Sequence, residues 1–119
     1  KTMSKVFVTQ YTSRMNFSRA SVYGDVVFLT DKEYRPHPCP EGTNDALVSQ
    51  IRERMKDYLP GTDYIITTGS AIPNIIVGMI LAERGERNHK ILKWSNRMED
   101  YEMFHLKYPL TTTRITENA

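Results

Sequence analysis

Tyr64-Ile-Ile-Thr-Thr-Gly-Ser70, followed by the apolar segment from Ala71 to Ala82, is the stretch that decides the fold. A short apolar run with a polar end is typical of a buried strand, and the glycine turn then leads into a helix with Ser70 as a candidate N-cap. The same pattern occurs elsewhere in the chain, at Val6-Phe-Val8, Val26-Val-Phe-Leu29 and Ile91-Leu-Lys-Trp94. We therefore expect four short strands that each end in small polar residues.

A second helix is predicted between Thr43 and Pro60, because apolar residues recur there at steps of one, three or four. The apolar stripe consists of Leu47, Val48, Ile51, Met55, Tyr58 and Leu59. Thr43 or Asn44 can cap this helix, and Pro60-Gly61 ends it. A last strand, residues 101 to 106, follows a connection of hairpin size.

The predicted order of elements is β-β-α-β-α-β-β. Because helices join the second strand to the third and the third to the fourth, these strands should be parallel. The expected fold class is α/β, a small Rossmann-like fold whose mostly parallel sheet of about five strands ends in a C-terminal antiparallel hairpin. We expect residues 4–108 to form a single domain and residues 109–119 to form a polar C-terminal tail.

The composition excludes several classes of protein. With 119 residues, of which 39% are hydrophobic and 25% charged, the chain has enough apolar material for one core. Its 16 basic and 14 acidic residues give a net charge of +2, too even for the basic footprint of a general nucleic-acid binder. No apolar run reaches the ~18 residues of a membrane span, and we expect no secretory signal. We therefore expect a cytoplasmic protein that does not bind membranes, and the charge gives no indication that it binds nucleic acid.

The polar strand ends indicate where a site would lie. Carboxyl ends of parallel strands meet at one edge of the sheet, and helix N-termini offer free N–H groups there. A small anionic or nucleotide ligand is therefore expected at this edge, with Gly69 allowing close approach to the backbone. The candidate ligand-binding residues are Thr9, Gln10, Thr30, Asp31, Thr68, Gly69, Ser70, Asn96 and Arg97.

Two neighbouring residues bear on this site. Arg14 reaches the same edge if the first strand is parallel to the others, and Trp94 could supply a stacking face, although in a strand it points opposite to Ser95. The Gly69-Ser70 turn lacks both the Walker spacing and the Gly-x-Gly-x-x-Gly spacing. A capped helix after a glycine turn is therefore the simpler interpretation of the turn itself.

The sequence favours a protein without catalysis. No serine, histidine and acid are placed to form a triad, and no paired carboxylates converge on the polar edge. No cluster has metal-ligand spacing, and neither a metal nor a cofactor is expected. His89 begins the fourth predicted strand, which places it at the opposite edge. Cys39 with His37 as base is a conceivable catalytic pair, but a cysteine and a histidine in a proline-rich loop are the simpler interpretation.

Short motifs along the chain carry a family resemblance: Val8-Thr-Gln10, Asn16-Phe17, Tyr23-Gly-Asp-Val-Val-Phe-Leu-Thr30, Asp63-Tyr-Ile65, Thr68-Gly-Ser70 and Leu92-Lys-Trp-Ser-Asn-Arg97. Together they resemble a family of small, uncharacterised α/β proteins of tailed bacteriophages, over about residues 4 to 108. The resemblance implies a phage origin and the host cytoplasm. The first strand is also similar to that of short viral ring nucleases, which degrade cyclic oligonucleotides. Those use a helix-borne histidine after a glycine turn, where this chain has Ser70-Ala71.

The resulting hypothesis is a phage-encoded, non-catalytic α/β binding protein. A homodimer is expected, because residues 72 to 81 leave almost no polar helix face and need cover from the core or from a partner chain. One alternative is a nucleotide-handling enzyme, such as an anti-defence protein that degrades or sequesters cyclic oligonucleotides. Another is a protein-protein inhibitor of a host factor that acts through the loop from Pro36 to Pro40.

Overall fold

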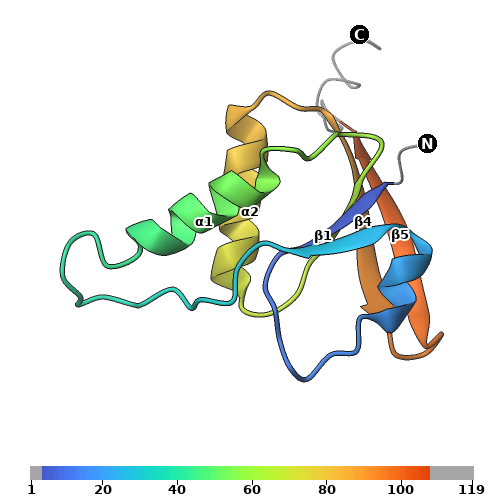
Figure 1. Cartoon of the computed structure of the whole chain (residues 1–119), viewed down its shortest axis with the longest axis horizontal. Coiled ribbons are helices and arrows are strands. Elements are labelled where there is room, and N and C mark those ends of the chain that lie inside the picture. The colour runs from blue at the N-terminus through green and yellow to red at the C-terminus, as the bar shows by residue number, and fades with distance from the viewer. Residues whose placement is uncertain (1–3, 108–119) are drawn as a thin grey trace, which may run out of the picture.

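The computed structural model describes residues 4–107 and contains every strand and helix that the sequence predicts (Figure 1). The strands are β1 (Lys5–Val8), β2 (Asp25–Phe28), β3 (Tyr64–Ile66), β4 (Asn88–Ser95) and β5 (Asp100–Lys107). The helices are α1 (Asp45–Met55), α2 (Ala71–Glu83) and a short 3-10 helix, η1 (Ser18–Val22). The predicted tail, residues 109–119, lies outside the described residues.

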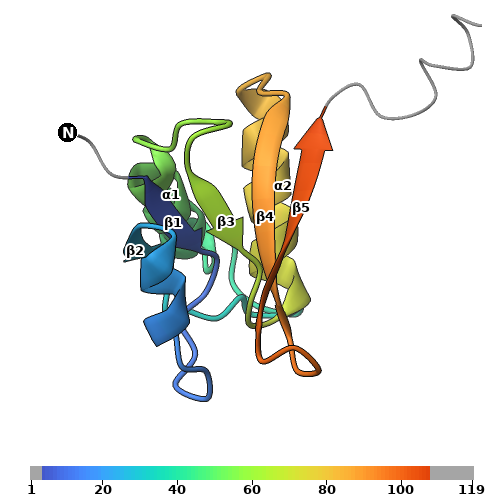
Figure 2. The same cartoon turned by 90° about the vertical axis from the view of Figure 1, so that its right-hand side faces the viewer.

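The five strands form one sheet in the order β2-β1-β3-β4-β5, with β5 at one edge (Figure 2). β1 is parallel to both β2 and β3, and β3 is parallel to β4. Only the last pair, β4 and β5, is antiparallel. The predicted α/β fold with a mostly parallel sheet and a C-terminal antiparallel pair is confirmed.

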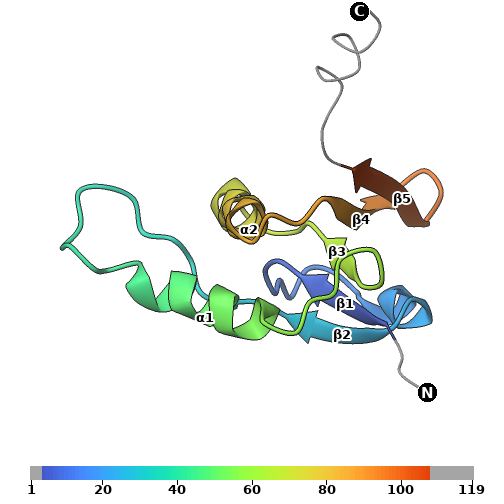
Figure 3. The same ribbon diagram turned by 90° about the horizontal axis from the view of Figure 1, so that it is seen from above.

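The handedness of the connections explains how the sheet is covered. The crossovers from β2 to β3 and from β3 to β4 advance in the same direction along the sheet, so right-handed connections place α1 and α2 on the same face. The connection from β1 to β2 advances the other way, and η1 lies on the opposite face (Figure 3). After β1 the chain continues toward one side of the sheet, and after β3 it continues toward the other side. The carboxyl edge between these two strands is therefore a topological switch point.

The alternation of side chains along the strands divides the core into two clusters. Phe7 and Ile65 point toward α1 and α2, where they join a cluster that includes Ile51, Met55 and Val77. Neighbouring strand residues point the other way and pack with the buried Ala20 of η1. This second cluster consists of Val6, Val8, Ala20, Ile66, Leu92 and Tyr101. Both faces of β1 and β3 are thus buried, as their continuous apolar runs predict.

α1 is shorter than its apolar stripe predicts. The helix ends at Met55, and the guanidinium of Arg84 donates hydrogen bonds to the carbonyl oxygens of Met55 and Tyr58, at 2.9 and 3.0 Å. These bonds satisfy carbonyls that a longer helix would have used internally. Leu59, which the stripe included, is 54% exposed, so its assignment to the buried face is wrong.

α2 is apolar on both of its sides. Pro73, Val77, Ile80 and Leu81 are buried against the sheet, whereas Ile72, Ile75 and Met79 on the outer side are 43%, 56% and 62% exposed. One side of the predicted apolar surface therefore packs on the core, and the other side faces outward in the single chain. Within residues 4–107, no helix has the length and apolar character needed to cross a membrane.

Candidate functional site

The switch point brings together five of the predicted site residues. We define this switch-point cluster as Thr9, Gln10, Thr68, Gly69 and Ser70. The Thr68 N–H donates to Thr9 Oγ1 at 2.9 Å, and Thr68 Oγ1 donates to the Gln10 carbonyl oxygen at 2.6 Å. These bonds join the segment after β1 to the segment after β3. The hydroxyl groups thus hold two strand ends together.

The side chain of Gln10 occupies the N-terminus of α2. Its Oε1 accepts a hydrogen bond from the Ser70 N–H at 2.8 Å, and its Nε2 donates to the Lys32 carbonyl oxygen at 2.9 Å. Gln10 is only 6% exposed. The Ser70 N–H at the helix terminus, a group that was expected to meet an anion, is therefore bound by a neutral amide of the protein itself. Ser70 is the N-cap residue of α2, as predicted, but its side chain makes no capping hydrogen bond.

Gly69 is required by the same contact. Its φ of +74° lies in the left-handed region, and a Cβ built there would collide with the side chain of Gln10. The sequence predicts that Gly69 lets a ligand approach the backbone closely. In the structure the group that approaches is the carboxamide of Gln10.

Thr30 and Asp31 follow β2 at the same edge but have different surroundings. Thr30 is fully buried, its Oγ1 donates to Gln50 Oε1 at 2.6 Å, and its carbonyl oxygen accepts from the Tyr11 N–H at 2.8 Å. Asp31 is exposed. Thr30 thus ties β2 to α1 and to the segment after β1.

Asn96 and Arg97 follow β4, and the structure separates their roles. Asn96 lines a pocket, described below, and its Oδ1 accepts a hydrogen bond from Trp94 Nε1 at 3.0 Å. Arg97 is exposed in the turn before β5. Neither residue has a hydrogen bond to the switch-point cluster among those within residues 4–107.

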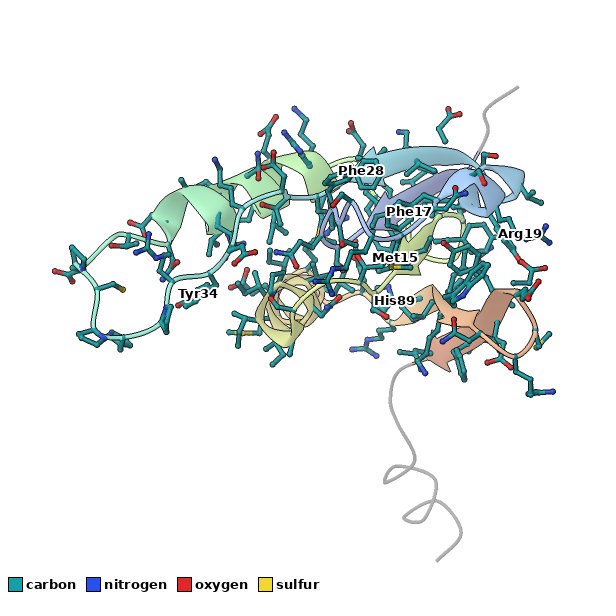
Figure 4. All side chains as sticks on the ribbon, turned by 90° about the horizontal axis from the view of Figure 1, so that it is seen from below. Met15, Phe17, Arg19, Phe28, Tyr34 and His89 are labelled. Carbon is teal, nitrogen blue, oxygen red and sulfur yellow. The ribbon has the colours of Figure 1, made fainter. Side chains whose placement is uncertain are left out.

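A pocket of about 400 Å³ lies at the carboxyl edge, on the face that carries η1. We call it the carboxyl-edge pocket; it is lined by Arg14, Met15, Asn16, Ser18, Arg19, Trp94 and Asn96. The first five come from the segment between β1 and β2, and the last two from the end of β4. Figure 4 shows Met15 and Arg19 on this segment, with Arg19 beside the β4–β5 hairpin. Only Asn96 among the predicted site residues belongs to this pocket.

An ion pair closes one side of the carboxyl-edge pocket. Arg19 Nε and Nη2 donate to the two carboxylate oxygens of Asp100, at 3.2 and 2.9 Å. The hydrogen bond from Arg19 and a further one from the Tyr101 N–H hold the pKa of Asp100 below its ordinary value of 3.8. The pair fixes η1 to the start of β5, so the two walls of the pocket are joined directly.

Trp94 is held in place by its neighbours. Its ring meets the ring of Tyr101 edge to face, with centroids 5.1 Å apart, and its indole N–H is taken by Asn96. Tyr101 is buried, and this burial raises the pKa of its phenol. The ring contact and the hydrogen bond hold the indole in one orientation in the wall of the pocket, and an aromatic ring held in this way is suited to contact with a flat group.

The opposite edge of the sheet has a different character. A groove of about 440 Å³ lies there, lined by Gly78, Leu81, Ala82, Gly85, Glu86, Arg87, His89 and Leu106. His89 Nδ1 is hydrogen-bonded to the Tyr58 hydroxyl at 2.6 Å, and burial raises the pKa of that phenol. His89 thus lies away from the polar strand ends, where the strand direction places it. Within residues 4–107, no group of three or more His, Cys, Asp or Glu could hold a metal ion.

The fold and the polar carboxyl edge define a small, doubly wound α/β protein with a topological switch point. The family model of the Phage Pam3 gp32-like protein matches residues 4–108, and the chain belongs to this family of phage proteins. Comparison with curated proteins and with solved structures found no match. The resemblance to small phage proteins is thereby confirmed, whereas a likeness to ring nucleases is not shown.

Proposed function

We propose that this phage protein is a non-catalytic binding protein that holds a small, nucleotide-like anion in the carboxyl-edge pocket, in the cytoplasm of the host. The observation that carries the proposal is the pocket itself, where Arg14 from beyond β1 meets Trp94 and Asn96 from the end of β4. Its volume of about 400 Å³ is in the range of small-molecule sites. Its position at the carboxyl edge of a doubly wound sheet is where such folds bind ligands.

The hydrogen-bonding groups of the pocket suit an acceptor-rich ligand. Arg14 has no side-chain hydrogen bond or ion pair among residues 4–107, so its guanidinium is available to a phosphate or carboxylate. Asn16 and Asn96 each use the side-chain oxygen inside the protein, accepting from the Ser18 N–H and from Trp94 Nε1. Their NH2 groups remain as donors. A ligand that brings several oxygen acceptors is therefore favoured.

The apolar side of the pocket suits a flat group. The Trp94 ring lies beside the donor groups, and Met15 adds an adaptable apolar contact. Stacking of a base on an aromatic ring contributes about 1 to 3 kcal/mol. An anionic group joined to an aromatic base, as in a nucleotide, would use both sides of the pocket at once.

The proposal of binding without catalysis rests on the lining. No histidine, cysteine, aspartate or glutamate is among its residues, so the pocket offers no strong general base. The carboxylate of Asp100, which is bound to the lining residue Arg19, is engaged by that ion pair. Ser18 is the one hydroxyl in the lining, and its neighbours include no group to activate it.

Thermal unfolding in the presence of candidate ligands tests the proposal. We expect mononucleotides or cyclic oligonucleotides to raise Tm by several degrees at about a hundredfold excess over Kd, whereas inorganic phosphate should give a smaller shift. Arg14→Ala should abolish the shift, while Arg97→Ala, which removes an equal charge outside the pocket, should keep it. An equal loss in both variants, or no shift with any nucleotide, would contradict the proposal.

Product analysis distinguishes binding without catalysis from the alternative of a nucleotide-handling enzyme. Cyclic and linear oligonucleotides are incubated with the protein and the mixture is resolved by chromatography. We expect the nucleotides to be recovered intact. Turnover that disappears in Arg14→Ala would show a nucleotide-handling enzyme in the same pocket and would overturn the non-catalytic part of the proposal.

A second candidate function, contact with a host protein, is favoured by the loop from Pro36 to Pro40. The loop extends away from the body of the molecule (Figure 1), and its base is braced by Asn44, whose side chain bonds both the N–H and the carbonyl of Arg35. Tyr34 beside it is 41% exposed. A stiff, exposed segment is suited to insertion into a partner's cleft. Capture of the same host protein by the wild-type chain but not by Tyr34→Ala would support this function.

A further inference from the structure

Among the described residues, no strand pairs with the outer edge of β5. β5 pairs only with β4, and within residues 4–107 no strand or helix lies beyond it (Figure 2). It spans eight residues, longer than a typical strand, and it contains no proline. A long edge strand presents a row of free N–H and C=O groups, and such a row is a template for pairing with another strand.

The side chains of this edge are apolar on both faces of the sheet. Phe104 stands opposite Ile91, which faces the helices, and Met103 stands opposite Leu92, which faces η1. Met103 and Phe104 are 52% and 46% exposed. Soluble proteins usually protect a free edge with charged residues, prolines or bulges. Here the charged residues lie toward the two ends of the strand, and Met103 and Phe104 in its middle are large and apolar.

The groove described above, at the end of the sheet opposite the carboxyl-edge pocket, is continuous with β5. Leu106, itself half exposed, lines it together with Gly78 and Ala82 from α2. The groove is therefore open beside the free edge of β5. One partner at this edge would cover both the unpaired backbone and the apolar groove.

We propose that this partner is a second copy of the chain, and that β5 pairs antiparallel with β5 of that copy about a two-fold axis near Met103 and Phe104. The two sheets then form one continuous sheet, and Phe104 and Leu106 of both copies meet on the helix side. The distribution of charge is compatible with this arrangement. Antiparallel pairing places the end of each strand that carries Glu102 near the end of its partner that carries Lys107, so ends of like charge do not come together.

The size of this surface is sufficient for a specific dimer. Eight residues at about 3.4 Å each give an edge of about 27 Å, and a sheet with one helix layer is roughly 20 Å thick. The flat contact is then roughly 540 Å² a side, and the total clears the roughly 1,000 Å² that a biological interface needs. The dimer does not depend on the ligand proposal, because antiparallel pairing places the two carboxyl-edge pockets at opposite ends of the joined sheet.

Sedimentation of the full chain at micromolar concentration tests the proposal. We expect twice the 13.8 kDa chain mass. Phe104→Lys should weaken the dimer about tenfold or more, because two lysines then meet near the axis. Val22→Lys is the matched control: Val22 is 79% exposed on η1, on a different part of the surface, and this variant should remain dimeric.

Hydrogen exchange on the wild-type chain gives a second readout that does not depend on the folding of a variant. The amides of β5 that face away from β4 should be protected at high protein concentration and should exchange faster on dilution. A monomer at micromolar concentration overturns the proposal. So does a dimer that folded Phe104→Lys leaves unchanged, or one whose β5 amides exchange equally fast at every concentration.

Discussion

Gln10 is the residue that occupies the helix N-terminus at the carboxyl edge, where the sequence predicts a ligand. Its carboxamide binds the N–H of Ser70 and the carbonyl of Lys32, so one side chain joins the ends of β1 and β3 to the segment after β2. A hydrogen bond made inside the protein at a helix N-terminus competes with any anion for the same N–H group. This is why our proposal places the ligand in the neighbouring pocket, where Arg14 has no side-chain partner among residues 4–107.

Gly69→Ala tests this arrangement. The new Cβ would collide with the Gln10 side chain in a backbone conformation that disfavours alanine, so we expect a loss of about 2 kcal/mol or more in the free energy of unfolding. Combining it with Gln10→Ala should give less than the sum of the two losses, because part of the collision disappears. Denaturant unfolding measures all three variants.

The control for Gly69 is Gly78. A Cβ at Gly78 would meet no atom within 4 Å, and the residue lies within α2. Gly78→Ala should therefore leave stability unchanged or raise it by up to about 1 kcal/mol, through helix propensity alone. Equal destabilisation at both glycines would contradict the packing of Gln10 on Gly69.

The Arg19–Asp100 pair predicts a pH dependence. Its hydrogen bonds lower the pKa of Asp100, so the pair contributes stability above the ordinary value of 3.8 and loses it as the pH falls through the lowered value. The contribution is small because both groups are exposed to solvent. The carboxyl carbon shift of Asp100, followed by NMR, should titrate below 3.8, and Arg19→Met should return it toward that value. An Asp100 that titrates at the same pH in both proteins would argue against the pair in solution.

At the scale of residues, the sequence predicted which polar side chains lie at the carboxyl edge better than it predicted their hydrogen-bond partners. Thr9, Gln10, Thr68 and Ser70 are at the predicted edge because strand direction alone places them there. That Gln10 would take the helix N-terminus depends on a distance between segments 60 residues apart, which periodicity does not contain. Arg19 and Asp100 are 81 residues apart, and neither position carries a local signal for the pair.

Asp63 shows how single residues connect the elements. Its carboxylate accepts from the Lys5 N–H at the start of β1 and from the Leu59 N–H after α1, at 2.9 and 2.8 Å, and it is 3% exposed. One buried carboxylate thus fixes the turn that leads from α1 into β3 against the neighbouring strand. Hydrogen bonds from N–H groups to a charged acceptor are stronger than those to a neutral one.

Asp63→Ala should therefore destabilise the protein by about 3 kcal/mol, because two N–H groups lose their acceptor in a largely buried place. Asp57→Ala removes the same charge from an exposed position nearby and should change the free energy of unfolding by about 0.5 kcal/mol or less. Chemical denaturation followed by circular dichroism compares the two. Similar small effects would show that Asp63 does not connect these elements.

The elements themselves were predictable where their pattern is local. The continuous apolar runs of β1 and β3 and the glycine turn into α2 predict both element type and order. The end of α1 was not predictable in this way, because the carbonyl oxygen of Met55 is bound by Arg84, which comes from the turn after α2. The periodicity of the sequence does not predict η1, a short 3-10 helix whose buried residue is Ala20.

At the scale of the whole molecule, our proposals give different roles to the carboxyl ends of the strands and to the outer side of β5. The carboxyl edge carries the polar pocket, and the free edge of β5 with its groove carries apolar surface. Membership in the Phage Pam3 gp32-like family defines the kind of protein but assigns no ligand. Ligand binding and dimer formation use separate residues, so a variant of one surface should leave the other property intact.

Trp94 allows the central claim to be measured directly, because it is the only tryptophan of the chain and lines the carboxyl-edge pocket. We predict that titration with the nucleotide that raises Tm most will change the Trp94 fluorescence in a saturable way. Arg14→Ala should lose this change, and Arg97→Ala should keep it. A nucleotide that raises Tm without altering the emission of Trp94 would contradict the account, because it would bind elsewhere on the protein.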